Sequence, residues 1–355
     1  MTLERFCRQY GEQLDPPNLS FPPSTSLLSP SIQSTLYNRL FNDTTVWPQP
    51  PIPYQTRVLK TLIARIEEAI ADPEEDEITD ALLEKWTSLL SHPKPDPLKQ
   101  AQQLTYISYT APTPFPGASS PFSSSSQEED KARTILTSES RGLILASGTT
   151  GFRTWEAALH LGTYLSTTAA GSALITGNRV IELGAGTGFV SLFCAKYLGP
   201  RRIVATDREP ALVDCMVDCA ARNEVDATKG GMFEAGIWEW GMPVGVSSSV
   251  PAMDNQTNNE EAVFDVALGA DLIYDTDLIP LLVSTIDALF TTHKIKQFVI
   301  SATLRNEDTF QAFLNACEQN GLKTDRIPFE SPAPEHQTGF FHSTSIPISI
   351  YQITK

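Results

Sequence analysis

The sequence predicts an α/β protein whose main part is a doubly wound parallel sheet, preceded by a helical region. Three observations favour this fold. Short β-branched runs alternate with segments of helical periodicity over residues 179–320. The β-branched run that starts at residue 179 stops at the carboxylate of Glu182, and glycines follow at positions 184, 186 and 188. An apolar segment of helical length comes next, and strand, tight turn and helix in this order form the opening unit of such a domain.

Length and charge limit what the chain can be. A chain of 355 residues is long for one domain, which indicates one large domain with an accessory region. The net charge of −16 argues against nonspecific binding to nucleic acid or to an anionic membrane, because such binding needs lysine and arginine against phosphate. The charge fits a basic protein partner better.

The cysteines and the N-terminus favour a cytoplasmic protein. The cysteines are odd in number, and no C-x-x-C pair or His/Cys cluster has the spacing of a zinc site, so we expect reduced thiols and no metal. The five are Cys7, Cys194, Cys215, Cys219 and Cys317. The first residues lack the apolar region of a signal peptide. No uncharged apolar run approaches the roughly 18 residues that span a bilayer.

Residues 1–100 are predicted to form a helical accessory region. Apolar side chains recur at helical spacing over 54–71 and 80–90, and a shorter segment lies at 32–41. The acidic stretch 72–77 is typical of a solvated turn. Because no catalytic constellation occurs here, the region either covers the main domain or helps to recognise a substrate.

Residues 101–130 are predicted to hold one strand and one loop. Alternating β-rich residues at 104–109 indicate the strand, and the proline- and serine-rich stretch 111–130 is typical of a flexible loop. Two short β-like runs, 134–136 and 142–146, lead into the main domain, which we assign to 131–355.

A helix is expected to begin at Thr154 and to run to about residue 166. Thr154 is a plausible N-cap, and Glu156 lies in the first turn, where a carboxylate favours the helix dipole. Gly148, Gly151 and Trp155 near this start could form a wall of a ligand site. The alternative is a capped helix with a tryptophan in the core.

The main domain is predicted to alternate strands and helices, which gives a parallel sheet covered on both faces. The strands are expected at 179–183, 203–206, 232–238, 264–270 and 297–302, and the helices at 188–198, 209–222, 276–291 and 307–320. Two last strands, near 323–329 and 343–353, have no helix between them, so we expect an antiparallel hairpin. The polar insertion 241–262 is expected to be a loop.

The glycine turn favours S-adenosylmethionine over a dinucleotide. A dinucleotide site has a third glycine where Phe189 stands here, and Glu182 would repel a pyrophosphate. A sulfonium and an amino group would tolerate that carboxylate. Asp207 closes the next strand, where it can accept both ribose hydroxyls, and Asp271 closes a third strand at the same crevice. Each carboxylate could instead be an ordinary strand-end charge.

These motifs resemble those of the seven-strand, class I methyltransferases. The motif D-x-x-Y, here Asp271 to Tyr274, is similar to that of eukaryotic protein-lysine methyltransferases. The run Gly148-Thr149-Thr150-Gly151 followed by residues 154–159 looks closest to the branch that methylates a lysine of translation elongation factor 2. The resemblance implies a Rossmann-like seven-stranded methyltransferase fold, S-adenosylmethionine as the cofactor, elongation factor 2 as the substrate, and a cytoplasmic monomer.

The resemblance also implies roles for the matching positions. Those that would bind the cofactor are Trp155, Glu182, Gly184, Gly186, Asp207, Trp238 and Ala270. Within this set, Asp207 would hold the ribose and Trp238 would lie against the adenine. Trp240 is the alternative to Trp238, because the long insertion leaves the register of the third strand open. Asp271 and Tyr274 would form the mouth where the methyl group is transferred.

A lysine acceptor must lose a proton before it can receive the methyl group. Free lysine has a pKa of about 10.4, so it must be deprotonated before it attacks. Asp271 can hold the ammonium and accept its proton, and Tyr274 can supply an aromatic wall favourable to a cation. No proline occurs at 272 or 273, unlike in sites that methylate adenine or glutamine.

Two alternatives and one local question stay open from sequence. The chain could methylate another protein, such as a chaperone, or it could be a non-catalytic assembly partner that keeps the cofactor. The intact pair Asp271 and Tyr274 argues against the second alternative. Phe340, Phe341 and His342 either touch the substrate or pack at the end of a strand.

Overall fold

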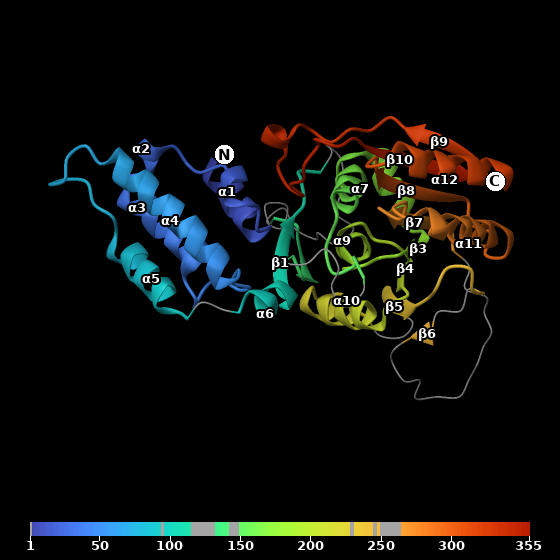
Figure 1. Cartoon of the computed structure of the whole chain (residues 1–355), viewed down its shortest axis with the longest axis horizontal. Helices are drawn as coiled ribbons and strands as arrows, with labels where there is room; N and C mark the ends of the chain where they lie inside the picture. Colours follow the sequence, from blue (N-terminus) through green and yellow to red (C-terminus); the bar gives the residue numbers. More distant parts are fainter. Residues whose placement is uncertain are drawn as a thin grey trace. The chain divides into compact units, whose positions relative to one another are not determined.

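The chain forms two compact units in a computed structural model, and Figure 1 traces their elements. One unit contains Met1–Thr110 and Glu139–Leu143, and the other contains Ala111–Ser138 and Ile144–Lys355. The structure describes residues 2–93, 96–114, 132–141, 149–227, 231–243, 247–248 and 264–355. The predicted strand at 142–146, Gly148, and most of the loops 111–130 and 241–262 lie outside these residues.

The first unit is helical, as predicted. Its elements are α1 (Thr2–Gly11), α2 (Ser24–Leu27), α3 (Pro30–Leu36), a π-helical turn (Tyr37–Phe41), α4 (Ile52–Ala69), α5 (Asp80–Ser91), α6 (Pro97–Gln102) and β1 (Thr105–Thr110). Its core collects apolar side chains of α1, α3, α4 and α5, among them Phe6, Leu36, Leu62 and Leu82. The long helix α4 buries one apolar face in this core, which explains the helical spacing in its sequence.

The second unit is built on one sheet of strand order β6-β5-β4-β3-β7-β8-β10-β9. The strands are β3 (Arg179–Leu183), β4 (Arg202–Asp207), β5 (Phe233–Ile237), β6 (Ser247–Ser248), β7 (Val266–Ala270), β8 (Gln297–Thr303), β9 (Lys323–Ile327) and β10 (Ile348–Thr354). Five strands, β5-β4-β3-β7-β8, are parallel. β10 runs antiparallel to both β8 and β9, so the expected hairpin is confirmed, with β10 inserted beside β8. The sheet is the seven-strand Rossmann-like arrangement, to which the two-residue β6 is added.

Within the described residues, the other elements of this unit include a strand and six α-helices, together with short 3-10 helices at Thr276–Leu278 and Pro334–His336. The strand is β2 (Thr134–Glu139), and the α-helices are α7 (Glu156–Thr167), α8 (Ala169–Ile175), α9 (Phe189–Tyr197), α10 (Pro210–Arg222), α11 (Ile279–Thr291) and α12 (Glu307–Gln319). Each parallel strand after β3 is reached through a helix, except that the path from β5 to β7 passes through the insertion. Most of these elements agree with the sequence prediction within a few residues.

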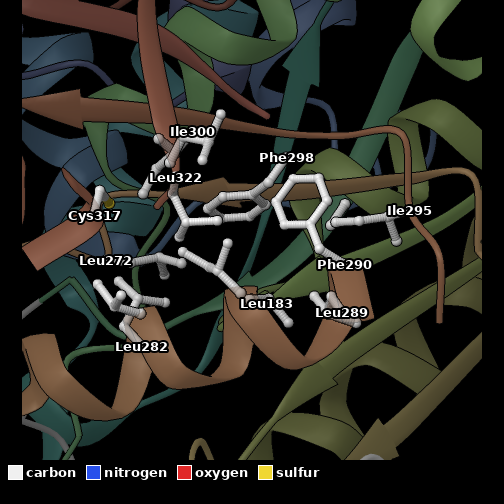
Figure 2. Close-up of a cluster of buried hydrophobic side chains, with 14 of the residues drawn as sticks. Leu183, Leu272, Leu282, Leu289, Phe290, Ile295, Phe298, Ile300, Cys317 and Leu322 are labelled. Atoms are coloured by element: carbon white, nitrogen blue, oxygen red, sulfur yellow. The ribbon is translucent and has the colours of Figure 1, made fainter. Parts of the chain in front are cut away.

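Side chains of β3 alternate between two packed layers. Ile181 and Leu183 join a core with Leu282 and Leu289 of α11. Figure 2 shows Leu183 and the two α11 leucines near Phe298 of β8. Glu182 points the other way and contacts α9 through Ser191. Because neighbouring residues of a strand face opposite sides of a sheet, α9 and α11 cover opposite faces.

Two details of the prediction need correction. The helix α7 begins at Glu156 with Trp155 as its N-cap residue, so Thr154 is not the cap. The Thr154 hydroxyl is instead hydrogen-bonded to the Thr187 hydroxyl at 2.7 Å, which ties it to the glycine turn. The short helix α8 was not predicted from the sequence, and the hydroxyl of Thr168 caps it by accepting the N–H of Gly171.

All five cysteines lie within the described ranges and are free thiols, as expected. Cys194, Cys219 and Cys317 are buried. Among the helices of the described ranges, none has both the length and the apolar character needed to cross a bilayer.

Candidate functional site

A cavity of about 480 Å³ opens at the carboxyl ends of β3, β4, β5 and β7. This is the switch point of a doubly wound sheet, where such folds bind their ligands. The volume suits a small-molecule ligand. The cavity brings together every cofactor and acceptor position named from the sequence: Trp155, Glu182, Gly184, Gly186, Asp207, Trp238, Ala270, Asp271 and Tyr274.

The glycine turn after β3 lines the floor of the cavity with backbone. Gly184 has φ of +58°, and a Cβ there would lie 2.7 Å from the Leu272 side chain. A Cβ at Gly186 would lie 3.0 Å from the carbonyl oxygen of Gly151. Both the left-handed backbone and the close neighbours therefore require glycine, and the turn exposes main chain where a side chain would block it.

Glu182 is a buried carboxyl held against α9. One oxygen accepts the Ser191 N–H at 3.0 Å and the Ser191 hydroxyl. Burial raises the pKa of Glu182 to about 7, although the two bonds from Ser191 act in the opposite direction. The side chain thus both braces the end of β3 and presents an ionisable group beside the cavity.

Asp207 is fixed by backbone amides at the end of β4. One carboxylate oxygen accepts the Gly186 N–H at 3.0 Å, and the other accepts the Glu209 N–H at 3.2 Å. Burial raises the pKa of Asp207, and the amide hydrogen bonds oppose that rise. Each oxygen has more than one acceptor direction, so an oriented carboxylate can still accept from the two hydroxyls of a ribose.

Both candidate tryptophans border the cavity. Trp238 follows β5, is almost fully buried, and donates its indole N–H to the Met242 carbonyl at 3.2 Å. Trp240 lies beside the glycine turn, with a ring carbon 3.4 Å from the Cβ position built on Gly184. The pair offers flat apolar walls of the kind that stack on a purine.

Asp271 follows β7 in a left-handed conformation, with φ of +56°. Its Oδ1 accepts the Thr303 N–H at 3.2 Å, and its Oδ2 accepts from Arg305 at 2.8 Å. The side chain is only 10% exposed. Tyr274 lies at the cavity mouth and is 57% exposed, so its ring is available to an incoming group.

Two arginines that the sequence analysis did not single out flank Trp155. The guanidinium carbons of Arg153 and Arg305 lie 4.8 Å and 5.2 Å from the indole ring, whose N–H donates to the Thr150 carbonyl. Glu156 contacts both arginines, at 3.5 Å and 3.3 Å. Arg305 lies two residues after the end of β8, so the carboxyl-end rule for parallel strands could have identified it.

Phe340 and His342 are buried, which answers the question left open for residues 340–342. The Phe340 ring packs edge-on against Phe189 and Phe193 of α9, with centroids 4.8 Å and 5.2 Å apart. Phe341 is also buried. The packing alternative is therefore confirmed for this segment.

The carboxyls, the indole rings and the glycine turn that line the cavity fit S-adenosylmethionine. A buried carboxylate suits the ribose diol, a second ionisable carboxyl suits a cationic amino acid end, and the two indoles suit an adenine. The glycine turn leaves room for the ligand close to the backbone. S-adenosylmethionine supplies a methyl group already activated by its sulfonium.

Comparisons with known proteins point in the same direction. The family model described as lysine methyltransferase matches residues 144–320. Protein-lysine N-methyltransferase EFM3 of Chaetomium thermophilum is 36% identical over 352 residues, which are 99% of this chain and 97% of that protein. EFM3 of Saccharomyces cerevisiae is 30% identical and covers 79% of this chain and 77% of its own length. Protein-lysine N-methyltransferase EEF2KMT of Bos taurus is 28% identical over 52% of this chain and 56% of its own.

Proposed function

Because the chain belongs to the protein-lysine N-methyltransferases, we propose that its acceptor is a lysine of translation elongation factor 2. The methyl donor of this enzyme is S-adenosylmethionine. The choice of acceptor is supported by the resemblance of residues 148–159 to the branch that methylates this factor, and by the similarity to proteins named EEF2KMT.

The observation that supports a lysine as the acceptor is the end of the cavity where Asp271 and Tyr274 lie. Asp271 lies there with its carboxylate nearly buried, and Tyr274 offers an aromatic ring at the mouth. We assign Asp271 the roles of binding the lysine ammonium, orienting it, and accepting its proton directly or through water. Tyr274 is assigned the wall that a cation favours. The partly desolvated mouth lowers the lysine pKa, which favours the neutral amine.

The cofactor positions are proposed as a set. We assign the methionine end to Glu182, Gly184 and Gly186, and the ribose to Asp207. Trp238 is assigned to one face of the adenine. The remaining contacts are assigned to Trp155 and Ala270. The support for these roles is that all seven side chains or backbones border one cavity.

We further propose that the enzyme acts as a cytoplasmic monomer of two parts, the helical residues 1–100 and the methyltransferase domain 131–355, joined by 101–130. The helical part is assigned a share in recognising the substrate. Sedimentation of the full chain and imaging of a tagged copy in cells are the corresponding measurements.

Labelling of a cell extract tests the acceptor. The full chain is incubated with radiolabelled S-adenosylmethionine and a eukaryotic extract, and labelled proteins are separated by size. We expect one band that an antibody against elongation factor 2 removes. A labelled band that this antibody leaves behind, such as a chaperone, would contradict the assigned substrate.

The variant Asp271→Asn tests the assigned acceptor residue in the same assay. We expect the rate of transfer to fall by about 100-fold or more, because the amide neither pairs with an ammonium nor accepts its proton. Binding of S-adenosylhomocysteine should stay at the wild-type affinity, since Asp271 is assigned to the acceptor end. Full transfer by this variant would refute the role.

A further inference from the structure

Arg305 places an internal cation at the acceptor end of the cavity. Its Nη1 donates to Asp271 Oδ2 at 2.8 Å, and its Nη2 lies 3.3 Å from Glu156 Oε2. Its guanidinium carbon lies 5.2 Å from the centre of the Trp155 ring. An acceptor lysine would bind to the same kind of site as Arg305, namely a carboxylate beside an aromatic ring.

The bond from Arg305 is not needed to hold Asp271 in place. The backbone N–H of Asp271 donates to the Ser301 carbonyl at 2.8 Å, which anchors the residue to β8. Oδ1 accepts the Thr303 N–H, so the side-chain rotation is also defined by the main chain of β8. Arg305 engages the other oxygen, Oδ2, which is therefore the acceptor atom left for a substrate ammonium.

Arg305 retains two partners when it leaves Asp271. Glu156 binds it through a separate hydrogen bond, and the Trp155 face stabilises a guanidinium. The side chain is 38% exposed, so it can rotate toward solvent without disturbing the core. The carboxylate can thus exchange one cation for another while the arginine stays within the cluster.

We propose that Arg305 occupies the ammonium position of the acceptor site until the substrate lysine displaces it. This inference rests on the acceptor role assigned to Asp271. A free lysine or a short peptide makes few contacts elsewhere, so it gains little free energy with which to displace the guanidinium. The guanidinium adds the same free-energy cost for every acceptor lysine, so only a folded protein substrate, which brings further contacts, binds well enough to displace it at a low concentration.

Binding of a small amine tests the proposal without depending on turnover. The full chain is saturated with S-adenosylhomocysteine and titrated with Nα-acetyl-lysine methylamide, followed by NMR or calorimetry. The variants are Arg305→Met, which keeps an unbranched apolar stem, and Arg305→Gln, which keeps a polar end without charge. We expect both variants to bind the probe about five- to tenfold more tightly than the wild type, because a partly exposed ion pair no longer competes for Oδ2.

Three comparisons separate this role from a structural one. Arg153→Met also removes a guanidinium from Trp155 and Glu156, but it leaves Asp271 paired and should not tighten probe binding. Arg222→Met removes a partly exposed Arg–Asp pair on α10, away from the cavity, and controls for the loss of a positive charge. Equal affinity for S-adenosylhomocysteine in all variants shows that the fold and the cofactor site are intact.

Steady-state kinetics supply a second measurement. With the short lysine probe as methyl acceptor, we expect KM to fall five- to tenfold in Arg305→Met, and the KM for the folded protein substrate to fall by a similar factor. Unchanged or weaker probe binding by both Arg305 variants, at unchanged affinity for S-adenosylhomocysteine, would overturn the proposal.

The double variant Asp271→Asn/Arg305→Met tests whether the tighter binding of the probe depends on the Asp271 carboxylate. Loss of the gained affinity in this variant supports displacement at Asp271. A gain that persists without the Asp271 carboxylate overturns both this inference and the acceptor role of Asp271. The identity of the protein substrate is judged separately, because the extract labelling can fail for elongation factor 2 while the amine titration still succeeds.

Discussion

The raised pKa of Glu182 predicts that the neutral substitution Glu182→Gln stabilises the protein at alkaline pH. The carboxyl is fully buried beside the glycine turn, and burial raises its pKa from 4.5 to about 7. In the unfolded chain the group ionises at its ordinary pKa, so between these two values the folded protein binds more protons than the unfolded one. The free energy of unfolding therefore falls as the pH rises through this window.

The size of this change in unfolding free energy follows from the pKa shift of Glu182. A difference of one pKa unit corresponds to about 1.4 kcal/mol, so the ionised carboxylate costs the folded state about 3 kcal/mol above pH 7. A glutamine in the same place has no charge to bury, and its carbonyl oxygen can still accept the N–H and hydroxyl of Ser191. The variant should gain most of that 3 kcal/mol at pH 8 and little at pH 4.5.

Urea unfolding of the cofactor-free protein at several pH values between 4.5 and 8 provides the assay. The useful quantity is the difference in unfolding free energy between variant and wild type, because other titrating groups contribute equally to both. Glu335→Gln, at an exposed position, serves as the matched control for the change from a carboxyl to an amide. Equal pH dependence in Glu182→Gln and wild type would refute the reasoning. The same variant should bind S-adenosylmethionine more weakly, since it removes the negative charge assigned to the methionine end.

Three further substitutions have expected outcomes. Gly184→Ala should destabilise the fold by about 2 kcal/mol or more, measured by urea unfolding, because of its positive φ and the 2.7 Å approach to Leu272. Asp207→Ala should raise the Kd for S-adenosylhomocysteine about tenfold or more in calorimetry; an unchanged Kd would remove the ribose assignment. Phe340→Ala should lower the melting temperature and reduce the free energy of unfolding by about 3–5 kcal/mol, because the ring fills the core against α9. Under conditions where that variant is folded, its turnover should match the wild type, whereas a selective loss of turnover would mean that the segment contacts the substrate.

Local patterns in the sequence were enough to predict most of the sheet domain. The strand at 179–183, the glycine turn and the following helix depend on periodicity and on backbone conformations that neighbouring residues specify, so they appear in the structure almost as expected. The strand-ending carboxylates Glu182, Asp207 and Asp271 line one cavity because parallel strands end at the same edge of a sheet.

Other features depended on partners that are distant in sequence. Thr154 does not cap its helix, and its hydroxyl bonds instead to Thr187 in the glycine turn after β3. Local sequence could not decide which of Trp238 and Trp240 borders the cofactor site, and the fold brings both to the cavity. The shifted pKa of Glu182 arises from burial that only the packed layers create.

The end of the cavity at Asp271 separates what the local sequence predicted from what depended on the tertiary structure. The motif from Asp271 to Tyr274 predicted a carboxylate and an aromatic ring at the mouth, because that information is contained in four consecutive residues. The pairing of Asp271 with Arg305 depends on β8 lying directly beside β7, and the contact with Trp155 depends on how α7 enters the domain. Strand order and helix entry result from the burial of whole faces, so the sequence could place Arg305 near the end of a strand, but its partners Asp271 and Trp155 are seen only in the folded chain.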